Sequence, residues 1–392
     1  MRITRIQLKN WLNFQKLDTG ALGERVFIIG PNAAGKSNLL ESLRFLRDVA
    51  LPAGKKPQGG GLQNAVTTDT RGGLSKLRCL NAKKDTEVRL QIDLTSDDGT
   101  KWTYDLGFKG EGQANNRIKL SRERITKNSA VLCDRPDARD KADPEQLTQT
   151  RLELTNANAA FRELSHFFSE TTYLHLVPQL LKYSSKIGGT VIESDPFGQG
   201  FLQRIAATNE KTRKARLNRI QKALDTVVPQ FKELDFRQDK VTGLYHLEAN
   251  FTHWRPTGAW QRENQLSDGT LRLIGLLWSL MEGNSLLLLE EPELSLNEEV
   301  VRQLPKVIHR IQTQNKTERQ VFITTHSEAL LSDSSIPAEE VLRLSATDTG
   351  TEIRPLDKQE KIMLKSGLSV AEVMLPSVNP AKANQLSLAL SS

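Results

Sequence analysis

Residues 26–38 read VFIIGPNAAGKSN, an apolar run followed by a loop that glycines bound and then by polar residues. The run 26–29 is typical of a short buried strand, and residues 37–49 place leucines at helical spacing. The octet GPNAAGKS between them matches the P-loop pattern in the strand-to-helix context in which that pattern binds phosphate. A glycine-containing turn that matches by chance is the alternative. The stretch predicts a phosphate-binding loop in an α/β sheet.

The loop supplies the groups that a nucleotide needs. Backbone N–H groups of residues 33–36 would surround the β-phosphate at the start of the helix. Lys36 would place its ammonium group on the β and γ oxygens, and the Ser37 hydroxyl would hold Mg²⁺. The predicted nucleotide-binding residues here are Gly30, Pro31, Asn32, Ala33, Ala34, Gly35, Lys36, Ser37 and Asn38.

A second motif, LLLLEE at residues 286–291, is an apolar strand pattern that ends in two carboxylates. Carboxyl ends of parallel strands meet at one edge of a sheet, so these groups would reach the phosphates. Glu290 would orient Mg²⁺ through water, and Glu291 would accept the proton of the attacking water. A solvated strand end is the alternative. Glu290 stands where Asp is common, and its extra methylene alters its reach.

Composition excludes several classes of protein. With 38% hydrophobic and 26% charged residues, the 392-residue chain is typical of a globular protein rather than a fibrous or disordered one. No apolar run approaches the roughly 18 residues that span a bilayer, and the start lacks a secretory apolar core, so we expect a cytoplasmic protein without a membrane partner. Cys79 and Cys133 are expected to be packed thiols.

The patterns predict an α/β architecture. Alternating helices and apolar strands in the last third favour a mixed or parallel P-loop sheet, and polar–apolar alternation around Asp97-Asp98-Gly99 favours an antiparallel β subdomain. Residues 127–149 are expected to form an exposed excursion, and residues from 357 a polar tail. Four segments follow: 1–176 with the P-loop and β-meander, 177–250 as a basic helical arm, 251–356 as the second half of the head, and 357–392 as the tail.

Two further motifs lie near the carboxylate strand. Residues 265–270 read QLSDGT, and residues 325–327 read THS. Ser267, Asp268 and Gly269 resemble the LSGGQ-type signature of ABC ATPases, and His326 resembles their switch histidine, which contacts the γ-phosphate. Taken singly, SDG is also an ordinary turn and His326 a structural histidine. In this order with the P-loop, the motifs make the chain similar to the ABC class.

Within that class, GKSN, EEPELSL and TTHSEALL resemble the RecF, SMC and overcoming-lysogenization-defect ATPases over residues 1–376. The resemblance implies an ABC-ATPase head that binds ATP and Mg²⁺, with Glu291, His326 and Lys36 as catalytic residues. It also implies a homodimer in which Ser267 and Gly269 of one chain contact the γ-phosphate held by the other.

The same resemblance suggests further site residues. Gln179 would be the Q-loop glutamine and a metal ligand, with a surface amide as the alternative. Asn297 stands where many relatives have His. Arg2, Lys9 and Asn13 are candidates to approach the nucleotide, and the sequence gives no way to rank them.

The net charge of +7 favours an anionic partner, and most of it lies in one segment. Residues 201–222 hold seven basic residues against Glu210 alone. About 230 residues separate Ser37 from Ser267, too few for the long coiled-coil arms of SMC proteins. The basic segment would bind nucleic-acid phosphates, with help from Lys55 and Lys56. A solvated helix face is the alternative. The predicted nucleic-acid contacts are Arg213, Lys214, Arg216 and Arg219.

Two features of the last third of the chain suggest partner proteins. Residues 385–390 read QLSLAL and resemble the peptide that docks on the bacterial sliding clamp through Gln385, Leu386, Leu388 and Leu390. A frayed terminal helix is the alternative. Nothing after His326 resembles a TOPRIM nuclease, so we expect any DNA cleavage to come from a separately encoded nuclease or effector. The expected role is genome defence or repair on DNA; the alternative is a slow ATP-dependent scaffold that restrains a toxin without binding DNA.

Overall fold

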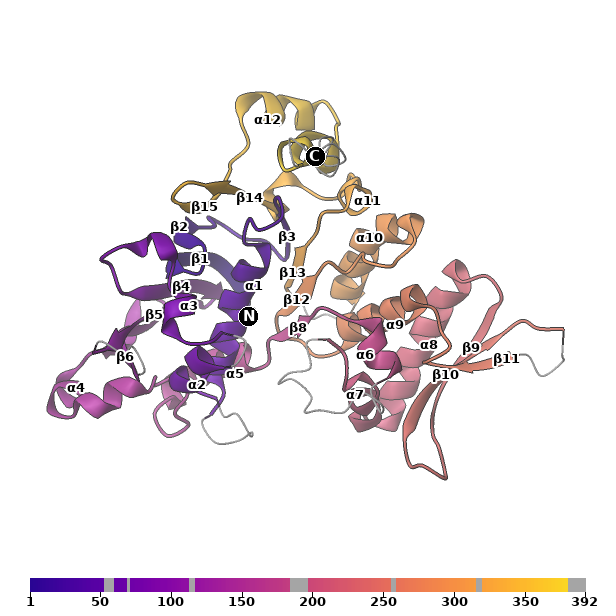
Figure 1. The fold of residues 1–392 in the computed structure, drawn as a ribbon, viewed down its shortest axis with the longest axis horizontal. Coiled ribbons are helices and arrows are strands. Elements are labelled where there is room, and N and C mark those ends of the chain that lie inside the picture. Colours follow the sequence, from indigo (N-terminus) through magenta and orange to yellow (C-terminus); the bar gives the residue numbers. More distant parts are fainter. Residues whose placement is uncertain are drawn as a thin grey trace, which may run out of the picture. The chain divides into compact units, whose positions relative to one another are not determined.

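The computed structural model of the protein describes residues 1–52, 60–68, 71–112, 117–183, 197–254, 259–314 and 319–379 (Figure 1). They form two compact units. The first comprises Met1–Thr172, Ser285–Leu288 and Arg319–Ser392, and the second Tyr173–Asn284 and Leu289–Glu318. This division differs from the four segments expected, because the signature groups with the predicted arm. Lys55, Lys56 and the QLSLAL peptide lie outside the described residues.

An antiparallel meander dominates the first unit. Its strand order is β2-β1-β4-β5-β6-β7. Apolar side chains alternate along β4 and β5 and lie on one face of the sheet. On that face the ring centroid of Phe108 lies 5.4 Å from that of Phe45 in the P-loop helix α1. The predicted hairpin around residues 97–99 is therefore confirmed. The bounds are β1 Arg2–Trp11, β2 Phe14–Asp18, β4 Val88–Thr95, β5 Lys101–Glu111, β6 Arg117–Lys127, β7 Ala130–Arg135 and α1 Lys36–Ala50.

A second sheet carries the predicted P-loop strand. Its order is β15-β14-β3-β13-β12-β8, and β3 pairs in parallel with both β13 and β14. The fold class is thus α/β with a P-loop sheet and an antiparallel subdomain, as the sequence predicts. The bounds are β3 Arg25–Ile29, β8 Thr172–Leu174, β12 Leu287–Glu290, β13 Val321–Thr324, β14 Val341–Thr347 and β15 Gly350–Ile353.

Residues 127–149 are mostly exposed, as expected, but they contain β7 and the helix α4, and Arg135 is buried there between Glu123 and Asp140. The expectation of a polar tail from residue 357 was wrong. Residues from 357 form two capped helices before Asn379, and α13 buries Val370. The helices are α2 Leu62–Thr67, α3 Leu74–Leu77, α4 Ala138–Ala142, α5 Arg162–Ser169, α11 Glu328–Leu331, α12 Lys358–Lys365 and α13 Val370–Met374.

The second unit is a lobe rather than a simple helical arm. The basic segment forms two helices, α7 and α8, and the chain then enters a small antiparallel sheet of order β11-β10-β9. Leu217, Ile220 and Leu224 of α8 are buried as their spacing predicts, whereas Val227 is exposed. The bounds are α6 Pro178–Lys182, α7 Phe201–Ala207, α8 Glu210–Val227, β9 Phe231–Gln238, β10 Tyr245–Phe251, β11 Ala259–Arg262, α9 Asp268–Met281 and α10 Glu298–Gln314.

None of the helices in the described part of the chain is both long enough and apolar enough to span a bilayer.

Candidate functional site

The P-loop of the first unit is shaped for an anion. β3 ends at Ile29, and α1 begins after Gly35, whose φ of 90° lies in the left-handed region. Gly35 provides no side-chain cap for the first turn of α1. The N–H groups at a helix start attract phosphate, because they carry partial positive charge and point away from the helix. The buried Lys36 ammonium donates to the carbonyl oxygens of Gly30 (3.0 Å) and Pro31 (3.2 Å), within the same loop.

Asn13 lies directly against this loop. A Cβ atom on Gly35 would lie 2.1 Å from Asn13 Nδ2, so only glycine fits there. The Asn13 amide donates to Thr351 Oγ1 (2.7 Å) and accepts from Asn38 Nδ2 (2.8 Å). It therefore connects the β1–β2 turn, the start of α1 and the β14–β15 hairpin.

The other two N-terminal candidates are engaged elsewhere. Arg2 pairs with Glu24 at 3.4 Å, and Lys9 pairs with Asp85 at 2.8 Å. Of the three residues that the sequence could not rank, Asn13 is the one that the structure places at the P-loop. Sequence reasoning could not find this, because the contact depends on the turn between β1 and β2.

His326 shares the sheet edge with the P-loop. Thr324 pairs with Ile28 in the parallel β13–β3 ladder, and Thr325 N donates to Ile28 O (3.2 Å). Both strands therefore end at the same edge, which is where ligands bind in open α/β sheets. His326 follows there with an exposed side chain.

The signature residues begin helix α9 of the second unit. Ser267 is the N-cap, and its hydroxyl accepts from Thr270 N (3.1 Å). A Cβ atom on Gly269 would lie 2.6 Å from the carbonyl oxygen of Ser295, in the EEPELSL segment. The glycine of the signature is thus required by the close approach of that backbone.

Asp268, the central signature residue, is held by α6. Lys182 Nζ lies 2.5 Å from Asp268 Oδ1, and Gln179 Nε2 donates to Asp268 Oδ2 at 2.7 Å. Gln179 therefore contacts the signature in this structure, and its role as a metal ligand stays a prediction. Lys182 was missed from the sequence, because a lone lysine on a short helix gives no signal.

The two carboxylates at the end of β12 have different surroundings. The phenol of Tyr173 donates to the carboxylate of Glu290, and His175 Nδ1 lies 3.3 Å from the Glu290 carbonyl oxygen. Glu291 has a φ of 44°, a strained conformation of the kind found at functional sites. The backbone of Glu291 is therefore held in a conformation that non-glycine residues seldom adopt.

Arg272 connects α9 to that turn. It donates to the carbonyl oxygens of Glu291 (3.1 Å) and Leu176 (2.5 Å). Burial lowers the pKa of this guanidinium from its usual value, while nearby carboxylates oppose the shift. A single arginine in the apolar pattern 271–281 is a signal that sequence reasoning overlooked.

Asn297 has a local structural role. Its side-chain oxygen accepts from Glu299 N (2.9 Å), and its carbonyl accepts from Val301 N (3.0 Å), so it begins α10. Asn is a strong helix N-cap residue, so its role here is to start the helix.

The predicted nucleic-acid residues on α8 divide into two groups. Arg213 donates to the carbonyl oxygens of Ala206 (3.2 Å) and Thr208 (3.3 Å), and Arg216 lies 5.1 Å from the Trp278 ring centroid. These two stabilise the lobe. Lys214 pairs with Glu210 on the exposed face, and Arg219 is exposed.

The oxygens of Ser37 and Glu290 are of the kind that Mg²⁺ prefers, and bound phosphates would supply more. Among the described residues, no group of three or more His, Cys, Asp and Glu side chains is placed to hold a metal.

Comparisons with known proteins agree with this fold. A family model described as "AAA domain, putative AbiEii toxin, Type IV TA system" matches residues 25–332, which is most of the chain. The DNA replication and repair protein RecF of Roseiflexus castenholzii is 29% identical over 97 residues, covering 24% of this chain. The match spans only 23% of the RecF protein.

Two solved structures share the fold. An SMC head bound to the C-terminal winged-helix domain of ScpA has a TM-score of 0.57 at 13% identity, over 92% of this chain and all of that one (100%). An Smc head with an extended coiled coil, bound to the C-terminal domain of ScpA derived from Pyrococcus furiosus, has a TM-score of 0.53 at 11% identity, over 93% and 98%. The chain belongs to the AAA-domain family whose model it matches and is an ATPase, and it shares its fold with SMC heads.

Proposed function

We propose that ATP and Mg²⁺ bring two copies of this protein together, and that hydrolysis lets them separate. The single observation that carries the proposal is that one chain holds one P-loop and one signature motif, and that each lies at the start of a helix. In ABC ATPases, which the chain resembles, the signature acts on the nucleotide of the partner. A chain with one of each then forms a two-fold homodimer around two nucleotides.

Each site residue has a role in this cycle. Lys36 and the first-turn amides of α1 bind the β- and γ-phosphates, and His326 contacts the γ-phosphate from the same sheet edge. Ser267 and Gly269 contact it from the partner subunit. Glu291 accepts a proton from the attacking water. Mg²⁺, with Ser37 and Glu290 as its protein ligands, neutralises phosphate charge when bound.

The test uses Glu291→Gln, which keeps the shape of the side chain and removes its basicity. We expect unchanged ATP affinity, loss of turnover and a dimer that persists in ATP, measured by light scattering with and without nucleotide. Lys36→Ala is the matched control and should lose both nucleotide and dimer. A Glu291→Gln protein that hydrolyses ATP at the normal rate would contradict the assignment of the base.

We further propose that the dimer acts in the cytoplasm on DNA or a DNA-associated complex, in defence or repair, and controls a separately encoded nuclease or effector. The matched family description names a type IV TA system, and the name of the RecF relative refers to DNA replication and repair. DNA-dependent ATP turnover by the purified protein tests the proposal.

A scaffold that restrains a toxin without direct DNA contact is the second candidate. The internal contacts of Arg213 and Arg216 favour it, because they occupy two guanidinium groups that α8 would otherwise offer to phosphates. In that case ATP turnover would change with the effector and not with DNA.

The tail peptide would connect the protein to the replication machinery. Deletion of residues 385–392 should abolish binding to the sliding clamp and leave ATPase activity unchanged. Equal clamp affinity in both forms would reject this part of the proposal.

A further inference from the structure

The outer face of the meander carries a row of cations that the proposed site does not use. In the register of the sheet, Lys16 of β2 is opposite Lys9 of β1, and Lys9 is opposite Arg89 of β4. Arg89 is opposite Gly107, and Gly107 is opposite Arg122 of β6. Like charges opposite each other in a sheet are unfavourable. An anion bound over the row would therefore reduce the repulsion between its cations.

The carboxylates near this row either lie beneath its arginines or form ion pairs with Lys9. Asp105 accepts from both Arg89 and Arg122, and its side chain is only 5% exposed, while those of the two arginines are 36% and 33% exposed. Solvent therefore meets the guanidinium groups rather than the carboxylate. Lys9 pairs with Asp85 (2.8 Å) and Glu87 (3.2 Å).

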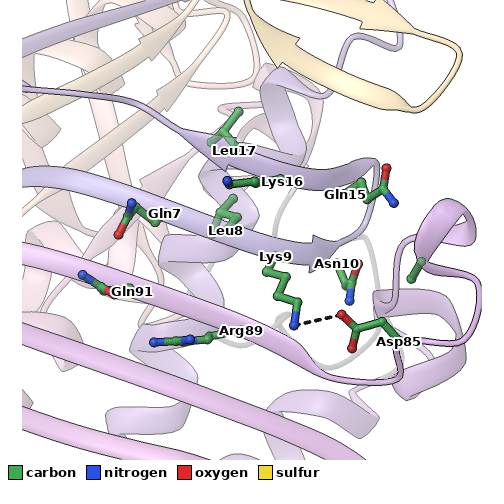
Figure 2. Close-up of a pocket in the computed structure, with 11 residues that line it drawn as sticks. Gln7, Leu8, Lys9, Asn10, Gln15, Lys16, Leu17, Asp85, Arg89 and Gln91 are labelled. Atoms are coloured by element: carbon green, nitrogen blue, oxygen red, sulfur yellow. Dashed lines mark ion pairs between the residues drawn. The ribbon is translucent and has the colours of Figure 1, made fainter.

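The Lys9–Asp85 ion pair (Figure 2) fixes a turn. The turn adds two more cations to this face. Asp85 N donates to the Ala82 carbonyl oxygen (2.9 Å), so Lys83 and Lys84 occupy the centre of the turn. Both side chains are exposed, as is Lys16. These three lysines make no side-chain hydrogen bond or ion pair with any residue that the structure describes.

A pocket of about 630 Å³ lies between the turn and the row. Besides Lys9, Lys16 and Arg89, its lining includes the amide side chains of Gln7, Gln15 and Gln91. Amides and cations together are the groups that proteins use to contact phosphates and sugars. The volume is within the range of pockets that hold small ligands, so it is large enough for one nucleotide unit.

We infer that this face of the meander, which we call the meander cation row (Lys9, Lys16, Lys83, Lys84, Arg89 and Arg122), binds the phosphate backbone of a nucleic-acid strand. With neighbouring strands about 4.8 Å apart, the row from Lys16 to Arg122 extends about 19 Å. An extended polyanion could contact the whole row, whereas a free phosphate would cover only the distance between two neighbouring strands. The inference rests on the DNA association in the proposed function, and it assigns the contact to the first unit instead of α8.

The test compares two charge-reversal variants of the full chain. K16E/K83E/K84E changes only exposed lysines that make no side-chain hydrogen bond or ion pair with a described residue, so it spares the ion pairs that shape the sheet. K211E/R219E/K222E changes three exposed cations on α8 and is the matched control. Fluorescence anisotropy would measure binding of a labelled 20-nucleotide single strand and its duplex across salt concentrations. ATP affinity and thermal midpoint would show that both variants fold.

We expect K16E/K83E/K84E to lose at least tenfold in affinity and the slope of log K against log salt for the duplex to become shallower by about 2.7, because three phosphate contacts are removed. The α8 control should bind nearly as the unmodified protein does. Unchanged affinity and slope in K16E/K83E/K84E would overturn the inference, whether or not the α8 variant loses binding. An unmodified protein that binds neither DNA probe would overturn the DNA part of the proposed function as well. Poly-glutamate that competes as well as DNA per charge would show an acidic-protein surface instead, which also overturns it.

Discussion

Lys182 on α6 and Asp268 at the first position of α9 form a 2.5 Å ion pair, with the Asp268 side chain 36% exposed. The pair neutralises a carboxylate that sits between the two signature residues assigned to the γ-phosphate. A partly exposed pair adds little to folding stability, about 0–1 kcal/mol. We expect the pair to matter more for binding, because it reduces the repulsion between Asp268 and a triphosphate that approaches this helix start.

Lys182→Ala should therefore weaken the ATP-driven dimer about tenfold, equivalent to about 1.4 kcal/mol, and leave ATP binding to the isolated chain unchanged. The uncovered carboxylate would repel the incoming triphosphate. Dimer dissociation in saturating ATP and the affinity for a fluorescent ATP analogue measure the two effects. Adding Asp268→Asn should restore the dimer, and a double variant as weak as Lys182→Ala would argue against the electrostatic cause.

Gly35→Ala should abolish ATP binding, because its Cβ atom would meet Asn13 Nδ2 at 2.1 Å and its φ is 90°. The matched control is Gly73→Ala, where φ is 93° and nothing lies within 4 Å of the new Cβ atom. Gly73 has a ψ of 171°, a backbone conformation that is almost exclusive to glycine, so the control carries backbone strain of about 1–3 kcal/mol without a steric clash and should bind ATP normally. Combining Gly35→Ala with Asn13→Ala should recover part of the affinity; no recovery would show that strain alone is responsible.

Glu153 should make stability depend on pH. Burial raises the pKa of this carboxyl to about 7 from 4.5, although Leu62 N and Thr150 donate to it. The folded protein therefore holds the proton more tightly than the unfolded chain, so stability falls as the pH rises from about 4.5 to about 7 and is flat above.

The full shift corresponds to about 3 kcal/mol. Glu153→Gln should remove this slope while its amide oxygen still accepts from Leu62 N. Urea unfolding at pH 5, 6, 7 and 8 measures it, and an equal slope in both proteins would exclude Glu153 as the cause.

Arg135→Ala should cost about 3–5 kcal/mol, because it leaves Glu123 and Asp140 buried without their cation. Arg117→Ala is the control, since Arg117 and Glu145 form an exposed pair, and it should cost less than about 1 kcal/mol. Urea denaturation of both proteins gives the comparison. Similar losses in the two variants would mean that the Arg135 network is not a buried anchor.

Patterns local in the chain were predicted well. The P-loop strand and helix, the hairpin around Asp97-Asp98-Gly99 and the strand β13 depend on spacing and glycine placement within a few residues. The buried network of Arg135 was missed, because a charged residue reads as exposed until its partners from other segments are known. The helices after residue 357 were missed for a related reason, since their burial depends on packing rather than on a regular apolar pattern.

The sequence by itself determined the class of protein, because the P-loop, the signature and the paired carboxylates are short contiguous motifs whose chemistry depends on neighbouring residues. Only the tertiary structure decided which side chains from other segments contact those motifs. Asn13 reaches Gly35 through a turn, Lys182 reaches Asp268 from another helix, and the meander cation row exists only in the register of the strands. Such contacts depend on the strand register, turns and helix packing of the folded chain, which no short sequence motif contains.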